Sequence, residues 1–176
     1  MEILWCITGA GHLLAETTAV MEKISKKHRI TIAFSTAAYE VTAMYNLLDR
    51  IKNVSKKVIL EKDQGASAPF CCRMNKKNFD RIIVAPCTAN TVAKIVNGIA
   101  DTLVTNVVAQ GMKGKIPVTV VPTDLKKKVE TTTHRGKRIT IHCRDVDLKN
   151  IKKLKHQGIE VVEEPKKIRY STFKVE

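Results

Sequence analysis

Short apolar runs alternate along the chain with longer segments in which apolar residues recur every three or four positions. Such runs are typical of buried parallel strands, and the longer segments are typical of helices that pack on one side. We therefore predict an α/β fold with a mainly parallel sheet of about six strands and helices on both faces. The predicted strands are residues 3–8, 30–34, 58–60, 81–85, 116–121 and, as an edge strand with alternating polarity, 138–142.

The segments between these strands predict helices and two loops. Residues 61–77 contain Gly, Ser and Pro without a sustained period, which predicts a long loop that covers a site or contacts a partner. Residues 126–137 are polar and basic, and they predict a solvated, mobile loop. The predicted helices are residues 13–27, 37–48, the region around 92–96, a helix from an N-cap at Asp101 to Gln110, and one from Asp145 to a stop at Gly158.

The length and composition describe one folded domain. The chain has 176 residues, of which 44% are hydrophobic and 27% are charged, and such a chain can bury a core without disulfide bonds. Its apolar runs are shorter than the roughly 20 residues of a membrane-spanning helix, and its first residues lack the basic leader of a signal peptide. We expect a single domain over residues 1–176, no membrane segment and a location in the cytoplasm.

The net charge of +14 points to an anionic partner. It is uneven, because residues 113–176 hold 17 basic and 8 acidic residues, whereas residues 1–112 hold 14 and 9. Nucleic acid is not the expected partner, since few aromatic residues accompany the basic ones and no nucleic-acid-binding motif occurs. An acidic protein fits this charge better.

The five cysteines favour reduced thiols over a disulfide scaffold or a metal site, because their number is odd and no C-x-x-C pair occurs. Cys6 and Cys143 lie in strand patterns and are interpreted as small core residues. Cys71 and Cys72 are adjacent in the predicted loop, next to Arg73. They are either exposed and reactive or a hydrophobic plug over a pocket.

The loops that follow the predicted parallel strands are the expected ligand site, since the carboxyl ends of such strands gather at one edge. The first loop begins like the dinucleotide motif G-x-G-x-x-G, but Leu14 stands in place of the third glycine. After the second strand, Ser35 and Thr36 replace the acidic residue that would bind a ribose. Hydroxyl groups beside a helix N-terminus suit the phosphate of a mononucleotide such as FMN, although they are also common helix caps.

The third loop, residues 86–91, consists of small and polar residues at the exit of the central strand. Small residues allow the backbone to approach a flat heterocycle, and Asn90 offers both a donor and an acceptor to its rim. The same residues also fit a helix N-cap, and both interpretations remain open.

Residues 85–91 (Ala-Pro-Cys-Thr-Ala-Asn-Thr) and 98–103 (Gly-Ile-Ala-Asp-Thr-Leu) carry a family resemblance. They resemble the P-A-S-A-N-T and G-x-A-D-N-L signatures of the homo-oligomeric flavin-containing cysteine decarboxylase superfamily. The resemblance covers a core of residues 1–122. Residues 123–176, a basic loop with a C-terminal strand and helix, are similar to archaeal flavoproteins related to dihydromethanopterin reductase.

The resemblance implies a flavodoxin-like (Rossmann-like), doubly wound domain that binds FMN and assembles as trimers or multiples of trimers. It also implies a set of cofactor-binding residues, with His12 as a phosphate or ribosyl contact unless it caps its own helix. These residues are Thr8, Gly9, Ala10, Gly11 and His12 in the first loop, Ser35 and Thr36 at the phosphate, and Pro86, Cys87, Thr88, Ala89, Asn90 and Thr91 at the edge of the isoalloxazine ring.

Departures from the family pattern bear on activity. Family decarboxylases have a histidine before the third loop and a Met-Asn pair after the fifth strand, and this chain has neither, nor the Arg-Glu-x-Pro-Leu segment of flavin prenyltransferases. The sequence favours an FMN oxidoreductase that takes electrons from an acidic protein such as ferredoxin and passes them to an acceptor such as the pterin dihydromethanopterin. No catalytic side chain is assigned. The alternatives are flavin-dependent decarboxylation of a cysteinyl substrate, and a basic nucleic-acid-binding or scaffold protein without a cofactor.

Overall fold

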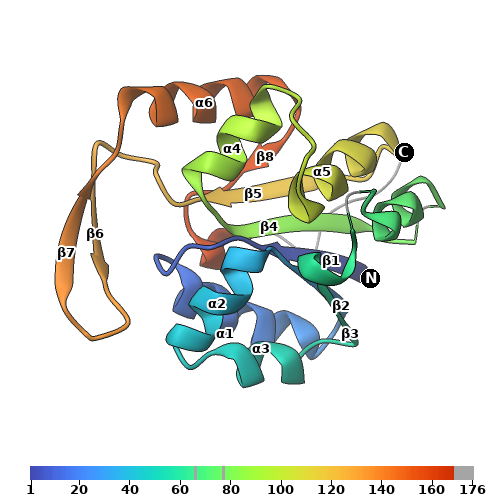
Figure 1. Ribbon diagram of the computed structural model, residues 1–176, viewed down its shortest axis with the longest axis horizontal. Helices are drawn as coiled ribbons and strands as arrows, with labels where there is room; N and C mark the ends of the chain where they lie inside the picture. Colours follow the sequence, from blue (N-terminus) through green and yellow to red (C-terminus); the bar gives the residue numbers. More distant parts are fainter. Residues whose placement is uncertain (66, 77, 169–176) are drawn as a thin grey trace.

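The computed structural model describes residues 1–65, 67–76 and 78–168, and Figure 1 shows a twisted sheet with helices on both faces. The strand order is β3-β2-β1-β4-β5-β8, and every pairing is parallel. The predicted α/β, doubly wound class is confirmed, with the strand order of a Rossmann-like sheet. The strands are β1 (Glu2–Ile7), β2 (Arg29–Phe34), β3 (Lys57–Leu60), β4 (Arg81–Cys87), β5 (Val118–Pro122) and β8 (Glu160–Val161).

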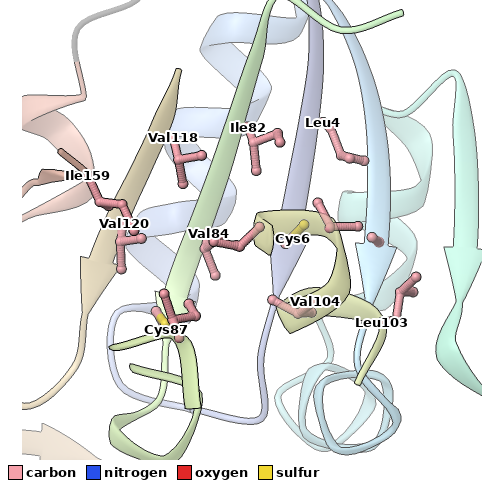
Figure 2. Close-up of a cluster of buried hydrophobic side chains, with 14 of the residues drawn as sticks. Leu4, Cys6, Ile82, Val84, Cys87, Leu103, Val104, Val118, Val120 and Ile159 are labelled. Carbon is pink, nitrogen blue, oxygen red and sulfur yellow. The ribbon is translucent and has the colours of Figure 1, made fainter. Parts of the chain in front are cut away.

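The strands separate two hydrophobic cores, because successive side chains point to opposite faces of the sheet. Leu4 and Cys6 enter the core under α4, α5 and α6, part of which Figure 2 shows. Trp5, which is fully buried, enters the other core with α1, α2 and α3. The helices are α1 (Leu14–Ser25), α2 (Thr36–Met44), α3 (Leu48–Asn53), α4 (Ala89–Val96), α5 (Leu103–Lys113) and α6 (Asp145–His156), with short 3₁₀ helices η1 (Glu61–Asp63), η2 (Pro69–Lys76) and η3 (Pro165–Lys167).

The sixth strand of the sheet differs from the prediction. Residues 138–142 do form a strand, β7 (Arg138–His142), but it pairs antiparallel with β6 (Lys128–Thr132) in a separate hairpin. The loop predicted at residues 126–137 is therefore wrong, since β6 occupies part of it. The edge position belongs to β8, whose two residues are too few to produce a hydrophobic pattern.

A buried polar network holds β8 against the sheet. Arg81 of β4 is only 1% exposed, and its Nε donates to Thr119 Oγ1 at 2.9 Å. The Arg81 guanidinium also pairs with Glu160 of β8, and Thr119 Oγ1 donates to the same carboxylate at 2.7 Å. Burial lowers the pKa of Arg81, and the charge of Glu160 opposes that shift. This charge pairing adds to the apolar contacts on either side of β8, where Ile159 and Val162 are buried in the two cores.

Two further elements differ from the predicted boundaries. The helix predicted at residues 37–48 is divided into α2 and α3, and Asn46 between them adopts a left-handed φ of 57°. The N-cap of α5 is Thr102 rather than Asp101. The predicted loop at 61–77 contains η1 and η2, and its residues 66 and 77 lie outside the described part, as do residues 169–176 of the predicted domain.

The hairpin β6–β7 stands apart from the sheet, beyond the carboxyl end of β5 (Figure 1). Tyr45, the residue that follows α2, contacts the hairpin in two ways. Its hydroxyl donates to the Thr132 carbonyl at 3.1 Å, and its ring centroid lies 6.2 Å from that of His134. All five residues of β7 are exposed. Among the described helices, none combines the length and apolar character that a bilayer crossing requires.

Candidate functional site

The carboxyl ends of β1, β2 and β4 bring the three predicted loops together. Thr8 joins the first and third loops, because its hydroxyl donates to the Pro86 carbonyl at 2.9 Å and accepts from the Thr88 N–H at 2.8 Å. The second loop joins the first through the Ser35 N–H, which donates to the Ile7 carbonyl at 3.1 Å. Residues far apart in the sequence therefore form one connected edge, as the strand-end rule predicts.

The first loop packs closely against α2 and its C-cap, and glycine stands at two of the contact positions. A Cβ atom at Gly9 would lie 2.6 Å from the Cβ of Ala37, near the start of α2. A Cβ atom at Gly11 would lie 2.2 Å from the hydroxyl of Tyr45. The glycines thus allow the backbone of this loop to lie directly beside the N-terminal half of α2 and its C-cap.

Unpaired backbone donors gather in the same loop. Within the described residues, the N–H groups of Gly9, Gly11, His12 and Leu13 have no acceptor. Leu13, the N-cap of the twelve-residue helix α1, has a left-handed φ of 63°. Successive N–H groups around a left-handed residue form a concave anion-binding nest, and the helix dipole adds to its positive potential. An anionic group such as a phosphate fits this chemistry.

Ser35 and Thr36 have different environments. Ser35 is the N-cap of α2, and its hydroxyl accepts from the Ala38 N–H at 3.0 Å. The capping geometry considered for this residue is therefore present, but the hydroxyl proton of Ser35 has no acceptor among the described residues. Thr36 instead donates through its N–H and hydroxyl to one carboxylate oxygen of Glu61, at 2.8 and 3.1 Å. A phosphate contact at Thr36 would require these two bonds to break.

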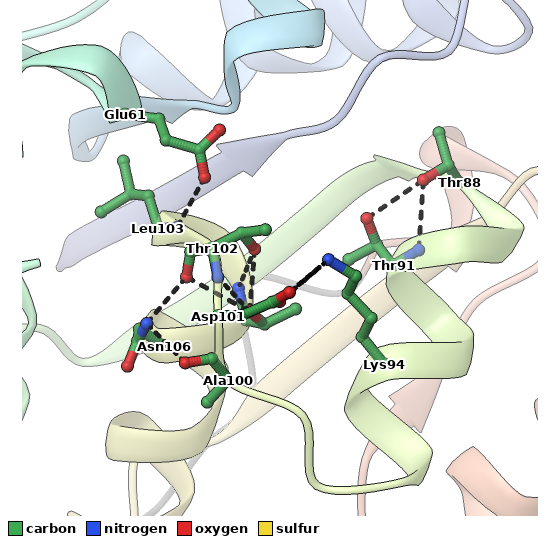
Figure 3. Close-up of polar contacts among 10 residues, drawn as sticks. Glu61, Thr88, Thr91, Lys94, Ala100, Asp101, Thr102, Leu103 and Asn106 are labelled. Carbon is green, nitrogen blue, oxygen red and sulfur yellow. Dashed lines mark hydrogen bonds and ion pairs between the residues drawn. The ribbon is translucent and has the colours of Figure 1, made fainter. Parts of the chain in front are cut away.

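Glu61 is a site residue that the sequence analysis missed. Its second carboxylate oxygen accepts from the Leu103 N–H at 2.7 Å, so one side chain caps both α2 and α5 (Figure 3). Anions at helix N-termini are stabilised by the unpaired N–H groups and the dipole. A signal was available, because Glu61 directly follows the third predicted strand at the edge where ligand-binding loops gather.

The third loop combines a helix cap with one free amide. Thr88 caps α4 by accepting from the Thr91 N–H at 3.3 Å, which Figure 3 shows. The whole of Cys87 is buried in the core, and burial raises the pKa of its thiol. The Asn90 side chain is exposed and has no partner among the described residues. Asn90 is thus available to a ligand, whereas Thr88 and Thr91 hydrogen-bond to each other at the N-terminus of α4.

Residues 98–103, the second segment with a family resemblance, stabilise the start of α5 through side-chain contacts. Asp101 pairs with Lys94 of α4 at 2.8 Å, and the Thr102 hydroxyl caps α5 by accepting from the Thr105 N–H at 3.2 Å (Figure 3). Asn106 adds donors to the Ala100 carbonyl at 2.8 Å and to the Thr102 carbonyl at 3.0 Å. These contacts hold α4 and α5 in fixed relation below the third loop.

His12 lies at the edge of a large groove beside the first loop. The groove has a volume of about 960 Å³, and its walls include α1 and α6. Burial lowers the pKa of His12, and the charges of Glu16 and Asp124 oppose this shift. The neutral imidazole is therefore favoured near pH 7. No hydrogen bond of the His12 side chain occurs within the described residues, which leaves the ring nitrogens available.

The thiols separate clearly by burial. Cys71 of η2 is buried, and burial raises its pKa to about 11, whereas its neighbour Cys72 is exposed. The plug interpretation thus fits Cys71 and the exposed one fits Cys72. Cys6 is buried as expected, but Cys143 is only partly buried and its thiol donates to Asp124 at 3.3 Å.

Comparisons with known proteins agree with this geometry. The Flavoprotein family profile matches residues 1–173. A dihydromethanopterin reductase (acceptor) of Methanocaldococcus jannaschii is 43% identical over 140 residues, and the match covers 75% of this chain and 57% of that protein. An uncharacterized protein of the same organism is 40% identical over 173 residues, covering 96% of this chain and 92% of that protein.

A solved structure gives a further comparison at the level of the fold. Burkholderia xenovorans DmrB in complex with FMN, described as a cubic protein cage for redox transfer, matches with a TM-score of 0.80 and 30% identity. The match covers 92% of this chain and 87% of that chain. This chain spans little more than half of the named reductase, but the family profile covers almost all of its residues. The chain belongs to the Flavoprotein family.

Proposed function

We propose that this chain is an FMN-dependent oxidoreductase whose flavin lies across the carboxyl ends of β1, β2 and β4. The observation that carries the proposal is the nest of unpaired N–H groups at Gly9, Gly11, His12 and Leu13, beside the free hydroxyl proton of Ser35. Unpaired N–H groups at the start of a helix, together with a hydroxyl donor on the neighbouring loop, suit a phosphate dianion. The family and the FMN complex of DmrB support FMN as the bound nucleotide.

The residues of this chain bind and orient the cofactor in this proposal. The first loop and Ser35 hold the phosphate, and the backbone of Pro86 to Thr91 and the Asn90 amide face the ring edge. Thr8 keeps the two loops in register through its two hydrogen bonds. Bound FMN supplies the electron chemistry, and the protein supplies its position and electrostatic environment.

The donor we propose is an acidic electron-transfer protein such as ferredoxin, and the acceptor is a pterin such as dihydromethanopterin. The strong positive charge supports the donor, since opposite charges steer association. The relatives named dihydromethanopterin reductase support the acceptor. We infer a cytoplasmic location, in which free thiols persist.

We also propose that the chain assembles as a trimer or a multiple of trimers. The hairpin β6–β7 supports an assembly, because an isolated two-stranded hairpin is only marginally stable and this one exposes Ile139 and Ile141. Related structures described as a cubic cage and as a dodecamer point the same way. Light scattering on the purified protein measures the assembly directly.

The test of the function begins with the visible absorbance spectrum of the purified protein after addition of FMN and removal of the excess. We expect retained flavin, and bleaching of its absorbance when reduced ferredoxin is added without oxygen. Retained flavin that ferredoxin does not reduce would contradict the proposed donor. Protein that retains no FMN would overturn the function and leave the non-enzymatic alternative. Release of carbon dioxide from cysteinyl peptides would instead support the decarboxylase alternative.

A further inference from the structure

Residues of α1 and α6 line a groove of about 960 Å³. Its other walls are the connection from β5 to β6, part of β6, and the segment that follows β8. This volume lies in the range of pockets that enclose small organic molecules, which is about 300 to 1,000 Å³. Of the three loops singled out from the sequence, only the first contributes to the groove, through His12 and Leu13.

The floor of the groove is apolar. Val20 of α1 and Leu148 and Ile151 of α6 line it, together with Leu13 and Leu125. The lining contains no Phe, Tyr or Trp. A floor of this kind suits the flat or aliphatic body of an organic molecule, but it offers no platform on which successive nucleic acid bases stack.

The rim of the groove is positively charged. Five lysines line it without an acidic partner within ion-pair distance among the described residues. Of the four lining glutamates, Glu163 pairs with Lys167 at 3.2 Å and Glu164 pairs with Lys166 at 2.8 Å, so only Glu16 and Glu130 remain unpaired. The five lysines are Lys23, Lys126, Lys128, Lys152 and Lys155.

One end of the groove reaches the candidate flavin site. His12 and Leu13 of the first loop line it, together with Pro122 and Thr123 at the carboxyl end of β5. His12 and Leu13 also contribute two of the unpaired N–H groups in the proposed phosphate nest. A molecule in the groove therefore has one end beside the flavin-binding loop and the other among the lysines of α6.

We propose that this groove binds the electron acceptor of the proposed oxidoreductase, and that the acceptor is an organic anion. Its ring lies at the end lined by Pro122 and Thr123, where the Thr123 N–H donates to the Cys87 carbonyl of the third loop at 3.0 Å. Its body lies on the apolar floor, and a tail bearing carboxylate or phosphate groups lies against Lys126, Lys152 and Lys155. This assignment rests on the proposed function. A contact between copies of this chain is the other occupant that the experiment below tests.

Helix α6 offers a matched pair of variants for the test. Lys152→Gln with Lys155→Gln removes two charges from the groove, and Lys149→Gln with Lys153→Gln removes two charges from exposed positions of the same helix outside the lining. Both variants have the same net charge and the same helix composition. A difference in probe binding between the two variants therefore measures the effect of charge inside the groove, and not the effect of the overall positive charge of the protein.

Calorimetric titration of the full-length, FMN-loaded protein with three probes tests the assignment. The probes are folic acid, which has a carboxylate tail, neopterin monophosphate, which has a phosphate tail, and 6-hydroxymethylpterin, which has no charged tail. We expect at least one tailed probe to bind about tenfold more tightly than the tailless one. The Lys152/Lys155 variant should lose most of that difference, and the Lys149/Lys153 variant should stay within about twofold of the unmodified protein. The tighter of the two tailed probes identifies the anionic group.

Three results would overturn the groove assignment. They are equal binding of tailed and tailless probes, equal losses in both lysine variants, and a lower assembly mass by light scattering in the Lys152/Lys155 variant with probe binding unchanged. The last result would assign the groove to a contact between copies of the chain. Flavin retention and ferredoxin reduction are measured on the same samples. A protein that is coloured and reducible but fails the probe test loses only the groove assignment, whereas a colourless one contradicts the oxidoreductase itself.

Discussion

At the scale of single residues, Glu61 gives the adjacent residues Ser35 and Thr36 different hydrogen-bonding environments. Its carboxylate takes both donors of Thr36 and also caps α5 at Leu103, which leaves Ser35 as the hydroxyl with a free proton at this edge. Because the Glu61 charge already occupies the outer side of the α2 N-terminus, a second anion is favoured on the opposite side, near the first loop.

Substitutions at Ser35 separate capping from phosphate binding. Ser35→Ala removes a helix cap, at a cost of about 0.5 to 2 kcal/mol, and also the free donor. Ser35→Asp keeps a capping oxygen but places a negative charge beside the phosphate. We expect both variants to retain FMN at least about tenfold more weakly, measured by fluorescence titration, with Ser35→Asp close to the unmodified protein in thermal unfolding.

Thr36→Ala is the matched control for this prediction. It removes a hydroxyl that already bonds to Glu61, so FMN affinity should change by less than about threefold. If Ser35→Asp holds FMN as tightly as the unmodified protein does, the phosphate does not lie at Ser35.

At the scale of secondary-structure elements, β8 depends on side-chain charge more than on its own length. Two residues form only a short ladder with Thr119 and Val120 of β5. The guanidinium of Arg81 in β4 adds an ion pair with Glu160 of β8. This network fixes the start of the segment that passes along the groove and ends at η3, so the groove wall depends on it.

Replacement of Glu160 tests this dependence. Glu160→Gln leaves the Arg81 charge in a buried position without its carboxylate, and we expect the free energy of unfolding to fall by about 1 to 3 kcal/mol in urea titrations. Because the Glu160 side chain is 36% exposed, the lower part of that range is favoured. Glu163→Gln is the control, since it breaks only an exposed pair with Lys167 and should change stability by less than about 0.5 kcal/mol. Equal effects of the two substitutions would contradict the anchoring role.

At the scale of the whole molecule, positive charge concentrates beside the candidate site. Residues 126–156, which include the hairpin β6–β7 and α6, contain 11 basic and 3 acidic residues. The hairpin lies beyond the carboxyl end of β5, and α6 lines the groove that reaches His12. An acidic donor drawn to this surface therefore approaches the edge at which the flavin is proposed to lie.

The ionic-strength dependence of electron transfer tests this arrangement. The Debye length falls from about 10 Å at 0.1 M salt to about 3 Å at 1 M, so attraction between the two proteins weakens as salt is added. We expect the bimolecular rate of reduction by ferredoxin, followed by stopped-flow absorbance, to fall about tenfold or more over this range. Reduction by a small uncharged photoreductant is the control and should be nearly insensitive to salt. A ferredoxin rate that does not change would rule out electrostatic steering.

Local sequence patterns were sufficient to predict the class of fold and the edge at which the candidate site lies. Parallel strands buried on both faces require continuous apolar runs, so five of the six sheet strands were predictable from local pattern. Loops at their carboxyl ends are adjacent in any such sheet, which is why the neighbourhood of Thr8, Ser35 and Thr88 followed from order along the chain alone.

Features that depend on contacts between segments far apart in the sequence became visible only in the folded chain. The two residues of β8 form no hydrophobic pattern, and the ion pair between Glu160 and Arg81 helps to hold them in the sheet. β7 pairs with β6 rather than with the sheet, because strand pairing depends on residues that are far apart in the sequence. The commitment of Thr36 to Glu61 and the groove between α1 and α6 arise from segments brought together by packing. Hydrophobic periodicity records which face of an element is buried, but it does not record which other element covers that face or which polar groups meet there.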